Sequence, residues 1–226
     1  MLIATYLDGA RRAHRALTEW DQAAGDGDFG DNLRSGLQAA ADRISDGAGL
    51  AEQLRVAADW FLDEVGGTSG PLFGLLFDAM ARRVGAGPGS GPDTNSEAAP
   101  GSCVESGDDE DRALIDGLAD GTAAIIRVGD ARVGDRTMVD ALQPTVAHLR
   151  SGRGRVDWAE AARVALQHAR QTAEIRARMG RASYLGERAI GTPDPGAMGV
   201  ALLFWSLAHT RDPNGAAELT SPADWG

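Results

Sequence analysis

The chain has 226 residues, of which 43% are apolar and 24% charged, as in a soluble globular protein with a sizeable core. Its 33 acidic and 22 basic residues give a net charge of −11, which argues against nucleic acid or an anionic membrane surface as a partner. No apolar run reaches the length of a membrane span, the N-terminus lacks a signal-peptide layout, and the single cysteine, Cys103, suits a reducing compartment, so we expect a cytoplasmic protein.

The spacing of apolar residues predicts an all-α fold. Apolar residues recur at helical spacing near the N-terminus and again from Leu54 to Val65. Asp157 followed by Glu160 predicts a capping box, and Pro195 suits the first turn of a last helix. That helix is apolar nearly all round and is therefore expected at the centre of the molecule. Eight helices are predicted, over residues 2–19, 31–44, 50–65, 70–83, 111–127, 137–150, 157–179 and 196–209.

Residues 85–111 form a segment rich in Gly, Pro, Ser and acidic residues between the fourth and fifth predicted helices. This composition cannot bury enough apolar surface to offset the entropy lost on ordering, so we interpret the segment as a mobile loop. A domain boundary there is an alternative, but the helices on either side are too few for two independent cores. We therefore expect one domain over residues 1–226.

The first functional candidate is the turn DQAAGDGDFGDNL at residues 21–33, which places four aspartates among three glycines. A solvated connection between two helices is the common role of an acidic turn. GDGDFG matches the dinucleotide-binding pattern G-x-G-x-x-G, but no strand precedes it and two carboxylates would face the pyrophosphate. An EF-hand loop counted from Asp26 needs glutamate at its last position, which is Leu37. Both motif interpretations are excluded.

A site for a hard cation is the remaining functional interpretation of this turn. Asp26 and Asp28 alternate along a glycine-kinked turn, and Asp21 can reach the same space from the end of the preceding helix. Three converging carboxylates repel one another by about 4 kcal/mol per contact at an effective dielectric constant near 20. Because Mg²⁺ removes this repulsion and fills its octahedron with water and phosphate oxygens, the turn predicts one or two Mg²⁺ ions that meet a nucleotide.

Three further glycine-bearing turns are candidates for the same site. GGTSGPLFG at residues 66–74 opens a helix with free amides that can hold phosphate. GDRTMVDAL at residues 134–142 opens another, and GRASYLGERAIGTPDPGA at residues 180–197 carries two arginines and Asp194. Each turn alone is typical of a helix cap or a helix-breaking connection. Together, the four polar turns predict one rim of a helical bundle that carries a single site.

Taken in order, GDGD, GGTSGPLFG, GDRTM and ASYLGERAIG followed by DPGA resemble the motifs of the L subunit of dihydroxyacetone kinase, the nucleotide-binding half of that enzyme. The resemblance covers nearly the whole chain apart from residues 85–111. It implies an antiparallel barrel of eight helices with ADP or ATP and two Mg²⁺ ions at one end. It also implies phosphoryl transfer to a short ketone or polyol, which a substrate-binding partner subunit holds through a covalent link to a histidine. A phosphotransferase-system component as a further partner and a homodimer are left open.

The resemblance also assigns roles to individual residues. The metal ligands that it implies are Asp21, Asp26 and Asp28. The catalytic candidate is Arg181, which would position the phosphates, since phosphoryl transfer depends mainly on positioning and charge stabilisation. The nucleotide contacts that it implies are Phe29, Gly30, Asp31, Asn32, Thr68, Ser69, Gly129, Met138, Arg181, Asp194, Pro195 and Gly196.

Three features depart from the pattern of the resembled family. Phe29 stands where histidine is usual, Arg136 stands where lysine is common, and the segment 85–111 is longer than the usual connection. A phenyl ring cannot donate a hydrogen bond to phosphate or exchange a proton. Two alternatives therefore stay open: a kinase of the same build for another hydroxylated acceptor in a biosynthetic pathway, and a nucleotide-loaded regulatory module without turnover of its own.

Overall fold

Helices account for all the regular secondary structure in the computed structural model, which describes residues 1–86, 106–184 and 186–226. These residues contain no β-strand, so the predicted all-α class is confirmed. The α-helices are α1 (Leu2–Ala24), α2 (Phe29–Ala41), α3 (Leu50–Asp63), α4 (Ser69–Ala86), α5 (Ser106–Gly129), α6 (Val139–Ser151), α7 (Trp158–Gln171), α8 (Pro195–Arg211) and α9 (Pro213–Ala216). Four short 3-10 helices complete the set: η1 (Thr172–Glu174), η2 (Arg181–Tyr184), η3 (Gly186–Ala189) and η4 (Pro222–Asp224).

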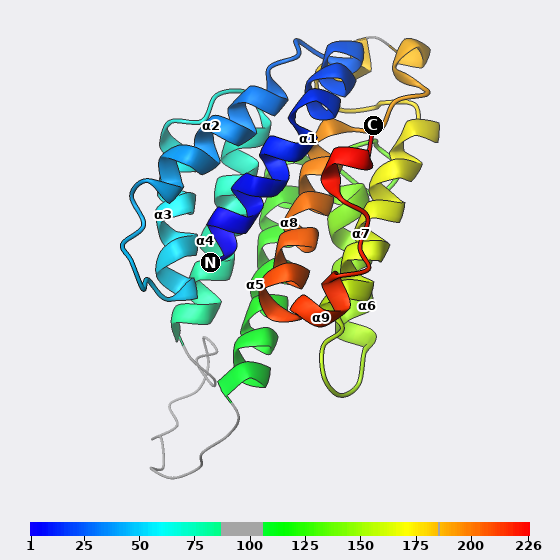
Figure 1. Cartoon of the computed structure of the whole chain (residues 1–226). Coiled ribbons are helices and arrows are strands. Elements are labelled where there is room, and N and C mark those ends of the chain that lie inside the picture. The colour runs from blue at the N-terminus through cyan, green and yellow to red at the C-terminus, as the bar shows by residue number, and fades with distance from the viewer. Residues whose placement is uncertain (87–105, 185) are drawn as a thin grey trace.

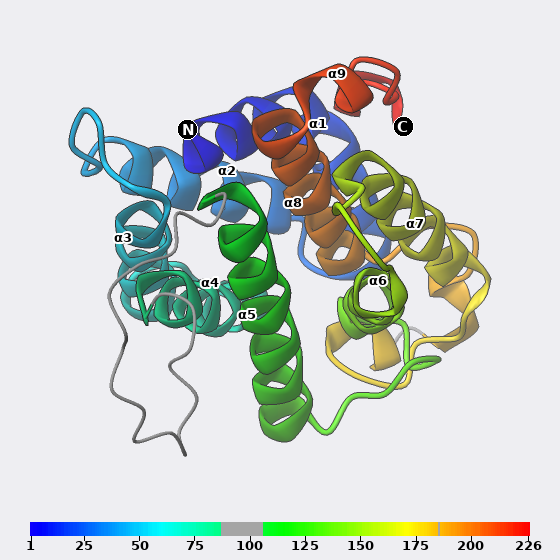
Figure 2. The ribbon, with the colours of Figure 1, turned by 90° about the horizontal axis from the view of Figure 1, so that it is seen from below.

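The helices α1 to α8 pack as a closed antiparallel barrel. Each contacts the next along the chain, and α8 contacts α1, which closes the ring. Successive helices run in alternating directions (Figure 1). Seen along the barrel, α8 lies between α1, α6 and α7, and it contacts all three (Figure 2).

Helix α8 supplies the centre of the core. Every residue from Pro195 to Ala208 is buried, as expected for a helix that is apolar all round. The hydroxyl group of Tyr6 on α1 donates a hydrogen bond of 2.8 Å to the carbonyl oxygen of Gly199. This bond fixes α1 along α8 and gives the phenol of Tyr6, which is fully buried, a hydrogen-bond partner. Pro195 is at the first turn of α8, as predicted. Asp157 caps α7 by accepting from Glu160 N, which is one half of the predicted capping box, while the carboxylate of Glu160 accepts from Arg163.

Near the candidate site, two helix ends differ from the predicted ones by more than two residues. Helix α1 continues to Ala24, so Asp21 belongs to its last turns rather than to the connection. The helix predicted over 157–179 ends as α7 at Gln171 and passes into η1. The reason is tertiary: the hydroxyl of Thr172 accepts a 2.7 Å hydrogen bond from Asp194 N, which ties the end of α7 to the segment before α8.

The expected loop over 85–111 also has different ends, and its middle, residues 87–105, lies outside the described part of the chain. Helix α4 continues to Ala86, and α5 begins at Ser106. Asp108 and Asp109 lie in the first turn of α5, where the helix dipole favours negative charge. Arg211 at the end of α8 donates to the carboxylates of Glu110 and Asp111, so packing recruits acidic residues that composition alone assigned to a loop.

The alternating helix directions place every second connection at the same end of the barrel. The connections α1–α2, α3–α4, α5–α6 and α7–α8 cover residues 25–28, 64–68, 130–138 and 172–194. They lie at the upper end in Figure 1 and contain the four glycine-bearing motifs or lead into them. The topology therefore gathers segments that are far apart in the sequence around one mouth.

Candidate functional site

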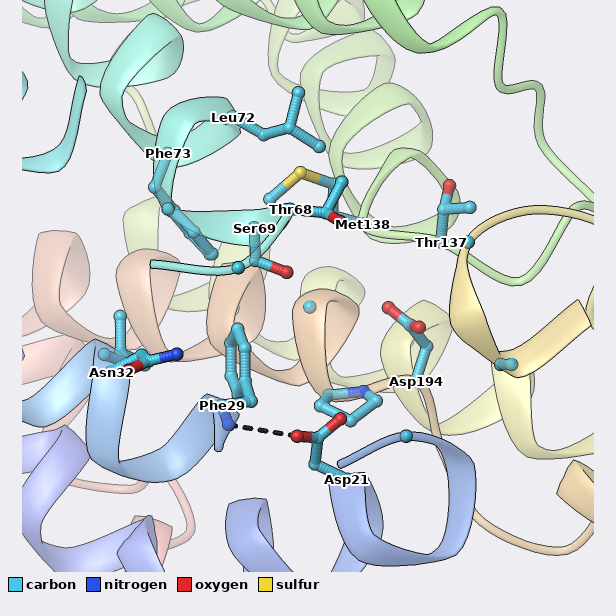
Figure 3. Close-up of a pocket in the computed structure, with 18 of the residues that line it drawn as sticks. Asp21, Phe29, Asn32, Thr68, Ser69, Leu72, Phe73, Thr137, Met138 and Asp194 are labelled. Carbon is cyan, nitrogen blue, oxygen red and sulfur yellow. Dashed lines mark hydrogen bonds between the residues drawn. The ribbon is translucent and has the colours of Figure 1, made fainter. Parts of the chain in front are cut away.

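A cavity of about 330 Å³ opens at the end of the barrel where these four connections meet. Figure 3 shows side chains from all four reaching the same space. Twelve residues of the predicted site line the cavity: Asp21, Asp26, Asp28, Phe29, Asn32, Thr68, Ser69, Gly129, Met138, Asp194, Pro195 and Gly196. The packing of the barrel thus brings most of the predicted set together.

The acidic side of the cavity comes from the connection between α1 and α2. One carboxylate oxygen of Asp21 accepts a 3.0 Å hydrogen bond from Phe29 N, which opens α2 (Figure 3). Asp28 is the N-cap residue of α2, but its side chain makes no capping hydrogen bond and is exposed. Gly27 has φ = 85°, a conformation that a side chain would strain, and this turn directs the neighbouring aspartates to the cavity.

These carboxylates provide the hard oxygen donors that Mg²⁺ prefers, so the chemistry of the donor set fits this ion. Asp28 has no capping bond to lose, and Asp21 keeps one oxygen beyond the bond to Phe29 N. Within the described ranges, however, no group of three or more His, Cys, Asp or Glu side chains is gathered closely enough to hold a metal ion. The three aspartates share one wall without converging, and their role as metal ligands stays a prediction.

The start of α4 forms the opposite polar edge. Thr68 and Ser69 lie where the chain enters this helix, whose N-terminal amides carry partial positive charge. The entry is tight, because a Cβ atom on Gly70 would lie 2.4 Å from the carbonyl oxygen of Val65. Glycine is therefore required for the end of α3 and the start of α4 to approach each other this closely. This geometry suits an anionic group at the mouth.

The inner wall of the cavity is apolar. The ring of Phe29 is buried and lies 6.4 Å from that of Phe73, centroid to centroid. A Cβ atom on Gly199 of α8 would lie only 2.8 Å from Phe29 Cζ, so this glycine makes room for the ring. Leu72 and Met138 lie across the cavity (Figure 3). Phe29, which stands where the resembled family usually has histidine, is thus part of a hydrophobic surface and can only make apolar contacts there.

The connection between α5 and α6 is held by Asp140, a buried residue in the first turn of α6. Its two carboxylate oxygens accept hydrogen bonds from Gly134 N at 2.6 Å and Thr137 N at 2.8 Å. Between these points Arg136 has φ = 63°, the left-handed region that costs a residue with a side chain about 1–3 kcal/mol. The clamp therefore holds Arg136 in a conformation that it would rarely adopt alone.

Arg136 also lines the cavity, although it is not among the predicted site residues. It is 1% exposed, and its Nη2 atom donates to the carbonyl oxygens of Ala189 and Thr192 at 3.0 and 2.9 Å. Its Nε and Nη1 atoms have no hydrogen-bond partner among the described residues. An unsatisfied buried donor costs about 1–3 kcal/mol. The sequence signal was an arginine inside GDRTM, which alone resembles an ordinary helix cap.

The comparisons with known proteins identify the family. A family model described as the DAK2 domain matches residues 23–209, most of the chain. The chain belongs to the DAK2 domain family.

Several proteins are similar to this DAK2 domain. It is 34% identical over 197 residues to a Listeria innocua protein named PEP-dependent dihydroxyacetone kinase 1, ADP-binding subunit DhaL, and the match covers 86% of each chain. It is 39% identical over 196 residues to an L-erythrulose 1-kinase of Mycolicibacterium smegmatis, covering 84% of this chain and 31% of that kinase. A crystal structure of the dihydroxyacetone kinase of C. freundii has the same fold, with a TM-score of 0.64 at 22% identity over 92% of this chain and 34% of that one.

This chain covers a different share of the length of each group of relatives. The DAK2 domain spans about a third of the length of the erythrulose kinases that it matches. It spans 86% of the separate ADP-binding subunit of Listeria innocua and of Escherichia coli.

No helix in the described ranges has both the length and the apolar character that crossing a bilayer requires.

Three predicted residues of the DAK2 domain are not placed in the cavity lining. Gly30 faces α1, where a Cβ atom would lie 2.4 Å from Thr18 Oγ1, so its role is close helix packing. Asp31 is exposed and its carboxylate binds His14 and Arg34 at 3.0 and 2.8 Å. Both follow the first residue of α2, where the helical twist turns them away from the mouth. Arg181 begins η2, and its side chain lies outside the described part of the structure.

Asp194 carries the clearest electrostatic signature of the site. It caps α8 by accepting a 2.8 Å hydrogen bond from Ala197 N, and it approaches the same space as Asp21 (Figure 3). Burial raises the pKa of its carboxyl group to about 6, although the bond from Ala197 and the charge of Arg136 lower it. A negative charge at this position is therefore disfavoured unless a cation compensates it.

We expect Asp194→Asn to stabilise the metal-free protein at neutral pH. Because the folded state binds the proton more tightly than the unfolded chain, the free energy of unfolding of the wild type falls as the pH rises from about 4 to 6. The variant should gain about 1–2 kcal/mol over the wild type at pH 7 and nothing at pH 4. Urea unfolding in EDTA across this pH range measures the difference. Asp157→Asn, at the exposed cap of α7, controls for replacing a capping carboxylate.

Proposed function

We propose that this chain is the nucleotide-binding phosphoryl-transfer subunit of a dihydroxyacetone kinase-like enzyme. It would hold ADP or ATP with two Mg²⁺ ions and pass the phosphoryl group to a short ketone or polyol on a partner subunit. The observation that carries the proposal is the cavity of about 330 Å³ at which all four connections of one end meet. The relatives named as ADP-binding subunits of dihydroxyacetone kinases, which are matched over most of their length, support it.

Different groups of the chain would bind the phosphates, exclude water and hold Mg²⁺. The amides at the start of α4 would bind phosphate oxygens, and the apolar wall around Phe29 and Phe73 would exclude water from them. Asp21, Asp26 and Asp28 would hold Mg²⁺ at the mouth, and Arg181 would position the phosphates. Bound Mg²⁺ would supply the charge that offsets phosphate repulsion, which is the main requirement of phosphoryl transfer.

Exposed apolar side chains near the mouth favour a partner that docks at this end. Val128, Val133 and Tyr184 are 67%, 53% and 90% exposed. Each lies within two residues of a residue that lines the cavity. Burying them against the substrate-binding subunit would bring the acceptor to the nucleotide and keep water out. A phosphotransferase-system component would rephosphorylate ADP in place. Two relatives named as ADP-binding subunits of a PEP-dependent and a PTS-dependent dihydroxyacetone kinase support this part of the proposal.

A kinase for a different hydroxylated acceptor is the second candidate. The relatives named as erythrulose kinases of Mycolicibacterium smegmatis and Pectobacterium atrosepticum favour it. Phe29 favours it too, because a buried phenyl ring cannot reproduce the polar contact of a histidine. The acceptor would be decided mainly by the partner, so both candidates share the same nucleotide site.

Calorimetric titration of the purified chain with ADP and with ATP tests the shared part of the proposal. In MgCl₂ we expect saturable binding to one site, and in EDTA a large loss of affinity. Absence of binding to either nucleotide in MgCl₂ would overturn the proposal for both candidates.

A further inference from the structure

The charge of the cavity poses a problem for any phosphate ligand. Four aspartates line it: Asp21, Asp26, Asp28 and Asp194. Among the described lining residues, Arg136 carries the only basic side chain. The molecule as a whole has a net charge of −11 and offers no long-range attraction for an anion. Among the described side chains that line the cavity, Arg136 is therefore the one that can offer a full positive charge to a phosphate, in addition to the partial charge of the amides at the start of α4.

The hydrogen bonds of Arg136 are those expected of a ligand-binding side chain rather than of one that only supports the fold. Its guanidinium group is anchored through Nη2 alone, to two backbone carbonyl oxygens. The other two nitrogens, Nε and Nη1, are buried donors without a partner in the described part of the chain. Burial lowers the pKa of this arginine, while the nearby carboxylate of Asp194 raises it. Buried donors with a purely structural role are normally hydrogen-bonded within the protein. Two buried guanidinium donors without a partner are instead expected where an anionic ligand supplies the acceptors.

The backbone supports the same interpretation. Residues held in the left-handed region without being glycine concentrate at ligand sites, where the surrounding structure enforces them. Here the carboxylate of Asp140 fixes the turn on both sides of Arg136, and Arg178 N donates to the carbonyl oxygen of Asp135 at 3.1 Å. The turn therefore presents the guanidinium group in one orientation, which lowers the entropy lost on binding.

We propose that Arg136 is a direct phosphate-binding residue, which holds the polyphosphate of a nucleoside di- or triphosphate through Nε and Nη1. This inference rests on the proposed function and adds a residue to its site. Because Nη2 remains bound to Ala189 and Thr192, the same guanidinium group links the phosphates to the segment that leads into α8. Nucleotide binding then stabilises this segment, and a nucleoside without phosphates does not.

Calorimetry with ADP and with adenosine in MgCl₂ separates this role from a structural one. Arg136→Gln should reduce the affinity for ADP by about 10- to 100-fold, the range expected for hydrogen bonds to a charged group, and leave that for adenosine unchanged. Arg136→Lys keeps the charge but loses the fork of donors, so it should lose part of the ADP affinity. Arg132→Gln is the matched control, because its side chain in the same turn is 80% exposed and should affect neither ligand.

Two outcomes would overturn the inference. One is wild-type affinity for ADP in Arg136→Gln; the other is an equal loss for ADP and adenosine, which would show that Arg136 acts only through the fold. Circular dichroism establishes whether each variant is folded. If neither variant folds, NMR on the ¹⁵N-labelled wild type decides the question. The Nε–H resonance of Arg136 should shift on addition of ADP and not on addition of adenosine. A resonance that does not shift with ADP contradicts the proposal. If the wild type itself binds no nucleotide in MgCl₂, the proposed function fails before Arg136 is tested.

Discussion

Replacing Asp28 by asparagine is expected to abolish tight binding of ADP while leaving the helical content unchanged. Asp28 is exposed at the mouth, and its side chain makes no capping hydrogen bond, so its removal costs the fold little. The cavity carries four aspartates, so we expect the phosphates to approach them through a bridging cation. Loss of a supporting residue around a metal typically costs 10- to 100-fold in affinity, so loss of a ligand should cost more than about 100-fold.

Calorimetric titration with ADP, with and without EDTA, measures this effect, and Asp26→Asn should behave in the same way. Asp31→Asn is the matched control, since Asp31 lies in the same acidic stretch but its carboxylate binds His14 and Arg34 at the surface. It should bind ADP like the wild type. If EDTA leaves the wild-type affinity unchanged, the nucleotide is held without metal and the proposed Mg²⁺ site is wrong.

The isolated chain is expected to bind nucleotide yet transfer its phosphoryl group to dihydroxyacetone only slowly. The family resemblance implies that a histidine of the partner subunit holds the carbonyl group of the acceptor covalently, and lysine amines are the other common nucleophiles for carbonyl compounds. The chain contains no lysine, and no histidine is found among the described residues that line the cavity. Of the four histidines, His14 pairs with Asp31, and His209 lies against Trp205 far along α8. The acceptor site is therefore expected on the substrate-binding partner.

Incubating the chain with Mg-ATP and a panel of dihydroxyacetone, erythrulose and glycerol, with and without a candidate partner subunit, tests this expectation. Turnover should appear on addition of the partner and should disappear again with Asp28→Asn, which shows that the nucleotide site belongs to this chain. Robust turnover by the chain alone would falsify the subunit hypothesis and indicate an acceptor site within the chain itself. The preferred compound in the panel separates the two candidate acceptor classes.

The sequence predicted where the helices lie, because apolar spacing is a local property. It predicted α8 as the central helix for the same reason, and the four polar turns as one rim. The ends of helices were less predictable, because they depend on distant partners: α7 stops where the hydroxyl of Thr172 accepts from Asp194 N, 22 residues away. The closure of the ring by contact of α8 with α1 was implied only by the family resemblance.

The importance of Arg136 depends even more on tertiary structure. Its burial is set by carbonyl groups 53 and 56 residues further along the chain. No local sequence pattern indicates such distant contacts. From the sequence alone, a buried arginine within a cap motif therefore could not be distinguished from a solvent-exposed one. Gly30 and Asp31 show the opposite case. The motif was transferred as a block, although the helical twist turns these two consecutive members away from the mouth while Phe29 and Asn32 on either side of them line the cavity.

The alternation of helix direction has a consequence for how this protein can be modified. The site depends on the connections after α1, α3, α5 and α7, whose lengths and glycines are fixed by the cavity. The connections after α2 and α6, residues 42–49 and 152–157, leave from the far end of the barrel and contain no residue that lines the cavity. Lengthening a surface connection costs only about 0.6 kcal/mol of closure entropy per doubling. Reporter domains or affinity tags inserted there should therefore leave nucleotide binding intact, and evolution can add partner-specific segments at the same two points.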